Sequence, residues 1–550
     1  MPPEAPQEKP AAEVIAPVSP PAKAEEIAET DEIAETEEEE EKAPPRPGIF
    51  QKLDLPLTFA TLVLGVGLLA ILQLWSTREL IDHDSLYHVQ AAHLLGKTDI
   101  LTVRKNPWMQ ATFLRDHYAD KEFLFHAFLF PFCFDGRDMD ANAKIATIIL
   151  GALVLLAFTV AVQGAGIRHA WLWILLLLGA GENFTYRLLE TRPHLLSIAL
   201  VLLSIRFIVR RQALPLYFTG YLLAWSYSGP QLLPLLAIVA TLARWIKDGQ
   251  RPAWGPVIGS TVGVVSGMIL NPFVPNNLYL WRVQNVDVLA RAWGLVPHLA
   301  RMGPELSPYT TRELLLGSPG FVLALGLAVG ALLLARRKAS TRTVQLGALS
   351  GATLVALLLS AKFMDYAAPL AVLFAASAVD DQWREGRGRP NVRIGLASVF
   401  TLVLVGLVVL ATAGAHRIVR KYFRDPPQLR GAAGWLASNA RGATVIHFDW
   451  NDFSTLFHDN PDSYYLFGLD PTFAEVWPPG AKLLEYLEAI RRPVDPKPVS
   501  GRFLAEYDGL TPRARFLVVK PYTPEANACL ASSLDRVYED DGGIVFSLGD

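Results

Sequence analysis

The chain has 550 residues, 51% of which are hydrophobic, and a formal net charge of −3. Its mean hydropathy is positive, and several apolar runs are about 20 residues long, the length of a helix that crosses the hydrocarbon core of a bilayer. These properties exclude an ordinary soluble protein and predict a mainly α, polytopic transmembrane helical bundle, with a lipid bilayer and no nucleic acid among its partners. The cysteines, Cys133 and Cys529, provide neither a disulfide framework nor a cysteine metal site.

An acidic segment begins the chain. Residues 1–44 contain 14 acidic and 3 basic side chains, many Pro, Ala and Glu residues and no aromatic residue. Such a segment buries too little apolar surface to fold, and it lacks the basic start of a signal peptide. We therefore expect residues 1–48 to form a disordered acidic tail on the cytoplasmic side.

The apolar runs predict a transmembrane domain over residues 49–420, with about eleven spans. Lysines and arginines gather on alternate connections, and basic loops are typically cytoplasmic. We therefore expect the chain to span a bacterial-type inner (plasma) membrane with its N-terminus in the cytoplasm. Two long loops, 76–142 and 273–316, are expected on the extracytoplasmic side. The spans are expected near 55–75, 143–162, 170–182, 193–209, 213–229, 231–246, 254–272, 317–335, 344–361, 365–380 and 394–413.

The first outer loop carries ionisable residues directly after the first span. Asp82, Asp84, Tyr87 and His88 stand there, and Asp84 and His88 are four residues apart, so they share one face of a helix. The simpler alternative is that Asp82 or Asp84 caps this helix, whose dipole favours negative charge at the N-terminus, and that His88 is an ordinary interfacial side chain.

The same loop repeats this chemistry in residues 115–132. Asp116 and Asp120 are four residues apart, as are Glu122 and His126, and the second pair leads into a strongly apolar stretch. Ionisable residues at membrane level are costly and tend to be functional. The alternative is an interfacial amphipathic helix whose charges are simply solvated.

A third cluster lies between two predicted spans. It contains Glu190, His194 and two arginines, Arg187 and Arg192, whose guanidinium groups match phosphate oxygens in a bidentate way. Pro193 suits the first turn of the next helix. The alternative is a set of Glu–Arg surface pairs.

A fourth pair, Lys362 and Asp365, stands at the outer boundary between two apolar helices. Lys362 is either a phosphate contact or an anchor that reaches to the membrane interface. Together, these four clusters are expected to meet on one side of the membrane, around a lipid-linked phosphate substrate. Carboxylates there can act as a general base or hold a divalent cation such as Mg²⁺ or Mn²⁺, with Asp82, Asp84 and Glu122 as candidate ligands.

Residues 421–550 predict a small α/β domain on the extracytoplasmic side. The segment 449–475 is rich in Asp, Tyr, Trp and Phe, which suits a sugar-binding surface and equally an ordinary aromatic core. The pattern predicts a helix over 428–439, a strand over 443–448, a mixed segment, and a closing strand–helix–strand–strand unit with strands over 515–520 and 543–548.

This arrangement resembles the GT-C superfamily of membrane glycosyltransferases. Its members carry an acidic motif after the first span; Asp82-His83-Asp84 occupies that place here, and Tyr87-His88 looks like the aromatic–His step seen in several of them. The resemblance implies an inverting enzyme that moves a sugar from a polyprenyl-phosphate donor to a hydroxyl of a glycan, lipid or protein acceptor. It also implies that Asp84 or Asp82 is the catalytic base or a metal ligand.

On this hypothesis Arg187, Arg192 and Lys362 hold the donor phosphate. The stretch 447–453 is not the Trp-Trp-Asp motif of oligosaccharyltransferases, which argues against N-glycan transfer. Three alternatives stay open: a lipid or polysaccharide transporter, a metal-dependent membrane phosphotransferase or hydrolase, and a non-catalytic scaffold. The supporting site residues are expected to be His88, Asp116, Asp120, Glu122, His126, Glu190, His194 and Asp365.

Overall fold

The computed structural model describes residues 49–97, 105–134, 138–334, 338–385, 390–492, 498–508, 510 and 512–549. The predicted acidic tail, residues 1–48, lies outside the described residues. The remainder of the chain, Ile49–Asp550, forms one compact unit. The predicted division near residue 420 into a transmembrane and a soluble domain therefore stays a prediction.

The predicted spans all fall on helices. Among the residues that the structure describes, five helical stretches are long and apolar enough to cross a membrane, and a sixth is counted if α13 and α14, which meet at 87°, form one broken span. The other predicted spans coincide with helices of 9 to 17 residues. The chain is thus mainly helical with several candidate spans, and the number eleven stays a prediction.

The bundle helices are α1 (Ile49–Trp75), α4 (Met139–Gly164), α5 (Ala170–Leu178), α7 (His194–Val209), α8 (Ala213–Ser226), α9 (Leu232–Asp248), α10 (Gly255–Ile269), α13 (Thr311–Gly317), α14 (Pro319–Leu333), α15 (Thr341–Leu359), α16 (Met364–Glu385) and α17 (Pro390–Tyr422).

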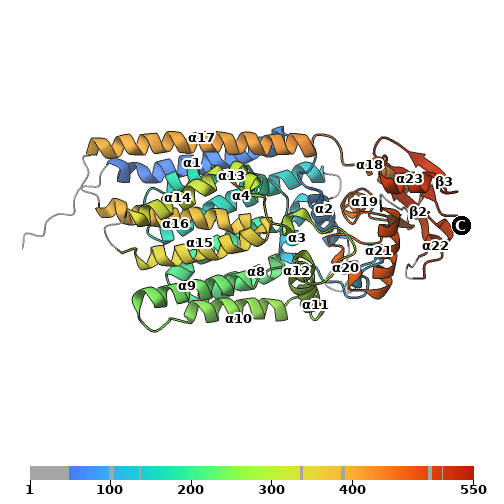
Figure 1. Ribbon diagram of the computed structural model, residues 1–550, viewed down its shortest axis with the longest axis horizontal. Helices are drawn as coiled ribbons and strands as arrows, with labels where there is room; N and C mark the ends of the chain where they lie inside the picture. Colours follow the sequence, from blue (N-terminus) through green and yellow to red (C-terminus); the bar gives the residue numbers. More distant parts are fainter. Residues whose placement is uncertain are drawn as a thin grey trace, which may run out of the picture. The chain divides into compact units, whose positions relative to one another are not determined.

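Small residues let α8 and α10 pack closely, and Figure 1 shows the two helices side by side. A Cβ atom on Gly259 would lie 2.2 Å from the carbonyl oxygen of Ala213, and one on Gly263 would lie 2.1 Å from that of Tyr217. Glycine is required at both positions because the two backbones approach too closely for any side chain, as in many helix pairs within membranes.

Short helices and turns link the long helices and carry many of the ionisable residues that the sequence singled out. They arise where the apolar runs are interrupted by proline, glycine and charged residues. These elements are α2 (His83–Leu95), η1 (Phe113–Arg115), α3 (Phe123–Leu129), η2 (Phe130–Phe132), α6 (Glu182–Arg187), α11 (Asn276–Arg282), the π-helical turn η3 (Val283–Asp287), α12 (Val288–Ala292), η4 (Pro304–Leu306) and η5 (Ala361–Phe363).

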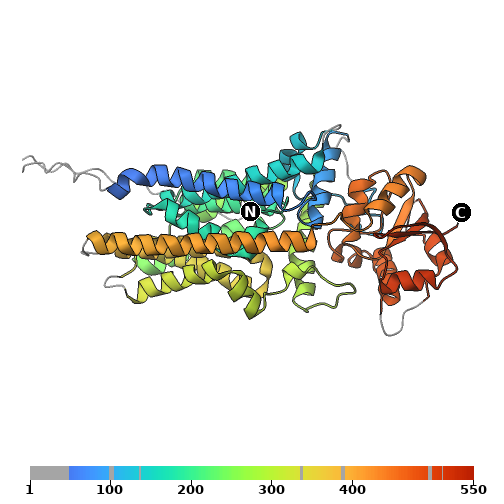
Figure 2. The same ribbon diagram turned by 90° about the horizontal axis from the view of Figure 1, so that it is seen from above.

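A four-stranded sheet lies in the C-terminal part, drawn in red in Figure 2, with strand order β1-β2-β4-β3. β1 (Thr444–His447) and β2 (Ala514–Val519) are parallel, whereas β4 (Ile544–Ser547) is antiparallel to β2 and to β3 (Asp535–Glu539). The predicted first strand and the closing strand–helix–strand–strand unit are confirmed. The helices of this part are α18 (Arg430–Asn439), α19 (Asp452–Asp459), α20 (Thr472–Glu475), α21 (Pro478–Ile490), α22 (Gly501–Ala505) and α23 (Pro524–Leu530).

Ion pairs join α18 and α19 to the helical bundle. Arg430 contacts Glu79 at 2.7 Å and Asp459 at 3.0 Å. His458 lies between two carboxylates, with Nε2 3.0 Å from Asp140 and Nδ1 2.6 Å from Asp459. Its side chain is buried, so these contacts are shielded from water and from salt.

We expect the protein to lose stability as the pH rises from about 6.5 to about 9. Burial alone lowers the pKa of His458, but the carboxylates of Asp140 and Asp459 outweigh it and raise that pKa from 6.5 to about 9. A pKa raised by folding stabilises the folded state below the unfolded value, and the contribution disappears as the pH passes the folded value. The free energy of unfolding should fall by roughly 3 kcal/mol over this interval, and the melting temperature in detergent should fall with it. The His458→Gln variant should lose most of that dependence, and a variant profile as steep as the wild-type profile would contradict the assignment.

Candidate functional site

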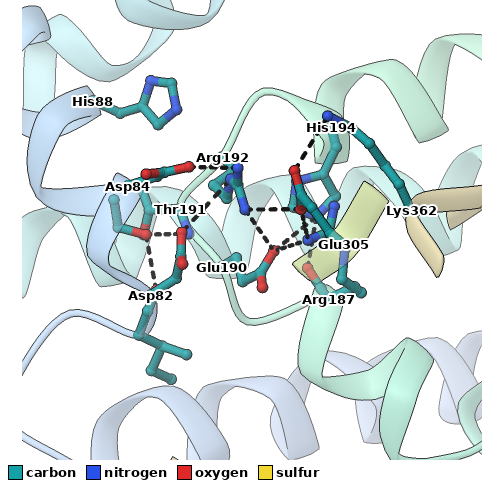
Figure 3. A network of polar contacts seen from close by, with 12 residues as sticks. Asp82, Asp84, His88, Arg187, Glu190, Thr191, Arg192, His194, Glu305 and Lys362 are labelled. Carbon is teal, nitrogen blue, oxygen red and sulfur yellow. Dashed lines mark hydrogen bonds and ion pairs between the residues drawn. The ribbon is translucent and has the colours of Figure 1, made fainter. Parts of the chain in front are cut away.

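Segments far apart in the sequence bring charged side chains together (Figure 3). The start of α2 provides Asp82 and Asp84, the turn between α6 and α7 provides Arg192, η4 provides Glu305 and η5 provides Lys362. The structure therefore places the first, third and fourth sequence clusters in one network, to which it adds a carboxylate from the loop 273–316.

Arg192 stands at the centre of this network. Its Nη2 donates a hydrogen bond to Asp84 Oδ2 at 2.5 Å, and its Nη1 donates to Glu305 Oε2 at 3.3 Å. Its Nε lies 3.6 Å from Asp82 Oδ2, and Nη1 lies 4.0 Å from Glu190 Oε2. One guanidinium group thus faces four carboxylates and fixes the orientation of Asp84.

Arg187 is held more tightly than Arg192. Its Nε and Nη2 donate to the two oxygens of Asp365, both at 2.9 Å, in the bidentate geometry that guanidinium and carboxylate groups favour. Its Nη1 lies 2.7 Å from Glu190 and 3.2 Å from Glu305. Each guanidinium nitrogen of Arg187 is therefore already engaged by a carboxylate, and Asp365 is completely buried beneath it.

Arg187 ends α6 and Arg192 lies in the turn that follows, and contacts at both ends hold this segment in place. Gly181 has φ 142°, and a Cβ there would lie 2.2 Å from the carbonyl oxygen of Gly317, so only glycine fits at the start of α6. At the other end, the Thr191 N–H donates to Ser85 Oγ at 3.1 Å, and the ring nitrogen Nε2 of His194 lies 2.8 Å from the Arg187 carbonyl oxygen. These contacts tie this segment to α2, which carries Asp84.

Burial and the neighbouring charges shift the pKa values of several carboxylates in the network. Burial raises the pKa of Asp82 to about 7; Arg192 opposes this shift, and the neighbouring charge of Asp84 adds to it. Burial likewise raises the pKa of Glu190, against the attraction of Arg187. Burial also acts to raise the pKa of Glu305, but Arg192 and the other nearby cations outweigh it and hold that pKa well below its usual range. The pKa values of Asp82 and Glu190 are thus raised, whereas that of Glu305 is lowered.

Asp82 and Asp84 do not act as simple helix caps. Asp82 occupies the N-cap position of α2, yet its side chain makes no capping hydrogen bond and its φ is 82°. A non-glycine residue rarely adopts this conformation, and such strain is often found at functional sites. Both carboxylates point towards Arg192 instead (Figure 3).

A cavity of about 410 Å³ opens beside the network. Its lining includes Asp84, Arg187, Arg192 and Lys362 but not Asp82. Lys362 has one carboxylate partner among the described residues, Glu305 at 3.4 Å. Apolar residues of α9, α12 and α15 line the cavity as well: Leu232, Leu235, Leu236, Val239, Val288, Leu289 and Ala356.

A second polar group joins α2 to α3. His88 Nδ1 lies 2.9 Å from His126 Nε2, and His126 Nδ1 lies 2.8 Å from Asp120 Oδ2. The carboxylate of Glu122 completes a set in which the donor atoms of His88, Glu122 and His126 all lie within 4.8 Å of one another. Of the predicted metal ligands, Glu122 belongs to this set, whereas Asp82 and Asp84 face Arg192. The set Asp82, Asp84 and Glu122 stays a prediction.

The structure also separates residues that the sequence had grouped. Asp116 is half-exposed and lies 3.9 Å from Lys105, away from the cavity. Conversely, sequence reasoning missed Glu305, which bridges Arg187, Arg192 and Lys362. A signal was present, because the loop 273–316 contains only three acidic residues, and Glu305 is one of them.

Comparison with solved structures identifies proteins of similar fold. AglB, an oligosaccharyltransferase from Archaeoglobus fulgidus solved with an inhibitory peptide and a dolichol-phosphate, has a TM-score of 0.60 at 11% identity over 90% of this chain and 75% of that chain. ArnT from Cupriavidus metallidurans, bound to undecaprenyl phosphate, has a TM-score of 0.56 at 16% identity over 90% and 98%. The arabinofuranosyltransferase AftD from Mycobacteria has a TM-score of 0.51 at 14% identity over 92% and 40%.

The resemblance to the GT-C superfamily is confirmed at the level of the fold, because all three similar proteins are membrane glycosyltransferases of that superfamily. At these identities the likeness shows the fold alone. Together with the candidate spans it makes the chain a multi-pass membrane protein. No protein-family model matches the sequence, and no curated protein is significantly similar to it.

Proposed function

We propose that the chain is a membrane glycosyltransferase that moves a sugar from a polyprenyl-phosphate-linked donor to an acceptor hydroxyl. One observation carries this proposal: Asp84 and Lys362 line the same cavity as a group of leucines and valines from α9 and α12. Such a cavity suits an amphiphile with an anionic head and a hydrocarbon tail. The proteins of similar fold support the proposal, since AglB was solved with a dolichol-phosphate and ArnT with undecaprenyl phosphate.

Lys362 is the best placed of the cations to receive the donor phosphate. It is about one-third exposed and has a single long contact with Glu305, whereas each nitrogen of Arg187 already faces a carboxylate. Arg187 and Arg192 line the cavity as well, and Arg192 supplies a second positive charge. The isoprenoid chain would lie along the leucines of α9 and the apolar residues of α12, and Trp293 and Leu295 beyond them are exposed as at a membrane interface.

Asp84 is proposed as the general base. The acceptor oxygen forms a bond to the anomeric carbon, its proton passes to the Asp84 carboxylate, and the bond from that carbon to the phosphate oxygen breaks. Polyprenyl phosphate leaves with the electron pair, and its negative charge is stabilised by Lys362 and Arg192. Arg192 also orients Asp84 through the 2.5 Å hydrogen bond. A positioned general base typically contributes about 10²–10⁴ in rate.

The side of the membrane on which the reaction takes place is proposed from the charges of the loops. Lys and Arg on alternate loops support a cavity that opens on the extracytoplasmic face, in a membrane proposed to be a bacterial-type inner membrane. The acceptor is a glycan, lipid or protein hydroxyl, and residues 421–550 would form the extracytoplasmic α/β domain. One structure of the Archaeoglobus fulgidus enzyme contains Zn and sulfate. A divalent ion bound near the cavity would neutralise charge on a phosphate group.

We expect Lys362→Met to weaken binding of undecaprenyl phosphate by about 10- to 100-fold, because a charge-assisted contact to phosphate contributes roughly 1.5–3 kcal/mol. Binding is measured on the purified protein in detergent, and transfer is followed with a labelled polyprenyl-phosphate sugar. Lys105→Met serves as the control, since Lys105 is an exposed lysine of the first loop. Equal affinities of the two variants would remove Lys362 from the phosphate site.

Product analysis separates the remaining functions. A metal-dependent hydrolase or phosphotransferase is the second candidate, because two members of the His88, Glu122 and His126 set, His88 and Glu122, line the same cavity. It would release the sugar or phosphate to water or to another carrier without forming a new glycoside. Movement of lipid across vesicles without any covalent product would instead indicate a transporter.

A further inference from the structure

The histidine pair between α2 and α3 has the arrangement of a metal site. His88 and His126 are buried and come from different helices, yet their ring nitrogens Nδ1 and Nε2 point at one another at 2.9 Å. Bonds of about 2.0–2.1 Å from nitrogen to a tetrahedral zinc ion separate two nitrogen ligands by roughly 3.3 Å. An ion would therefore fit between the two rings after a movement of a few tenths of an ångström.

Glu122 supplies an unused ligand atom at the same place. Its side chain is almost fully buried, and its Oε1 lies 3.3 Å from Lys121. Its Oε2 is buried and has no hydrogen-bond partner among the residues that the structure describes. A buried carboxylate oxygen without a partner is costly, so this oxygen is available as a ligand atom.

Asp120 orients His126 as metal-bound histidines are usually oriented. His126 Nδ1 lies 2.8 Å from Asp120 Oδ2, so an Nδ1–H donated to that carboxylate leaves Nε2 free of its proton and turned towards His88. The other oxygen of Asp120 accepts the backbone N–H of Glu122 at 2.9 Å. Carboxylate–histidine–metal arrangements fix the tautomer and raise the basicity of the ligand.

We propose that His88 Nδ1, His126 Nε2 and the Glu122 carboxylate bind one divalent ion of the zinc class, with Asp120 as a positioning residue. Two imidazoles and one carboxylate favour Zn²⁺ over Mg²⁺, which prefers oxygen ligands. The site differs in ligands and in metal from the set Asp82, Asp84 and Glu122 with Mg²⁺ or Mn²⁺ that the sequence predicted.

The proposed site keeps one side open. His88 and Glu122 line the cavity, and so does Asp84, which precedes His88 by one helical turn. Three protein ligands with an open fourth position are typical of catalytic rather than structural zinc. The open position therefore faces the space in which the reacting groups are proposed to meet. The site itself does not depend on glycosyl transfer, because its test measures metal binding in the absence of any donor.

The test uses the full chain purified in detergent, free of any polyhistidine tag, stripped with a chelator and then dialysed against Zn²⁺ with a large excess of Mg²⁺. Elemental analysis should find about one zinc per chain. His126→Ala should abolish binding, Glu122→Gln should weaken it at least tenfold, and Asp120→Asn should weaken it by about 10- to 100-fold. His117→Ala, which removes an exposed histidine of the same loop, should retain the metal.

Cobalt provides an independent readout. The wild-type protein loaded with Co²⁺ should show visible d–d absorption, which Glu122→Gln reduces and His117→Ala does not. If His126→Ala fails to fold, Glu122→Gln still tests metal binding. This variant keeps the shape of the side chain, and Oε2 makes no hydrogen bond to any described residue that the change would break. Wild-type protein that binds less than about a tenth of an equivalent of zinc, or a folded Glu122→Gln variant that binds like wild type, would overturn the proposal.

Discussion

Asp84→Asn should lower the rate of sugar transfer by about 10³-fold or more while the protein still folds and still binds polyprenyl phosphate. A carboxamide cannot take a proton from the acceptor hydroxyl, so the contribution of the general base is lost. The fold should survive because an asparagine carbonyl oxygen can still accept the hydrogen bond from Arg192 Nη2, and Arg192 keeps its contact with Glu305. The measurement is the initial rate of transfer of labelled sugar by purified protein in liposomes.

Two further aspartates of the same loop provide the controls. Asp116→Asn should be indistinguishable from wild type, because Asp116 is half-exposed and lies outside the cavity. Asp82→Asn should have a smaller effect than Asp84→Asn, since the carboxylate of Asp82 does not line the cavity and its raised pKa already leaves it partly protonated near neutral pH. Wild-type rates in both Asp84→Asn and Asp82→Asn would mean that the residues or the reaction are wrong.

The positions of the helices were predictable because the signals are local. A run of apolar residues, a proline at a helix start and a strand of alternating or continuous apolar residues each depend on neighbours in the sequence. The predicted strand–helix–strand–strand unit at the C-terminus and the helix that carries Asp84 and His88 are both found. The number of spans was not predictable to the same degree, because helices such as α5 and α8 have the composition of a span and only 9 and 14 residues.

The partners of the charged residues were not predictable from the sequence. Spacing places Glu122 and His126 near one another, but nothing local shows that His126 meets His88 of another helix, or that Asp120 lies behind it. The same holds for Arg187, whose bidentate partner Asp365 is 178 residues away. Such contacts depend on how the helices pack, and the local spacing of residues does not show that packing.

Arg187 differs from Arg192 in its bidentate contact with a fully buried carboxylate, that of Asp365. We expect Arg187→Met to destabilise the protein by about 3–5 kcal/mol, because it leaves the fully buried carboxylate of Asp365 without its cation. Asp365→Asn should cost less, since Arg187 retains Glu190 and Glu305. The double variant Arg187→Met with Asp365→Asn should recover most of the loss, as expected of groups that interact directly.

Stability and donor affinity together distinguish a structural role from phosphate binding. Apparent melting temperatures of the four proteins in detergent form a double-mutant cycle, and undecaprenyl phosphate affinity is measured on the same samples. If Arg187 mainly supports the fold, the double variant should bind the lipid within a few-fold of wild type, unlike Lys362→Met. A stable Arg187→Met variant with strongly weakened lipid binding would instead identify Arg187 as a phosphate ligand. The substitution would then have removed a contact with the donor phosphate and not the contact that stabilises Asp365. The cycle therefore decides which cations of the network face the substrate and which hold the carboxylates in place.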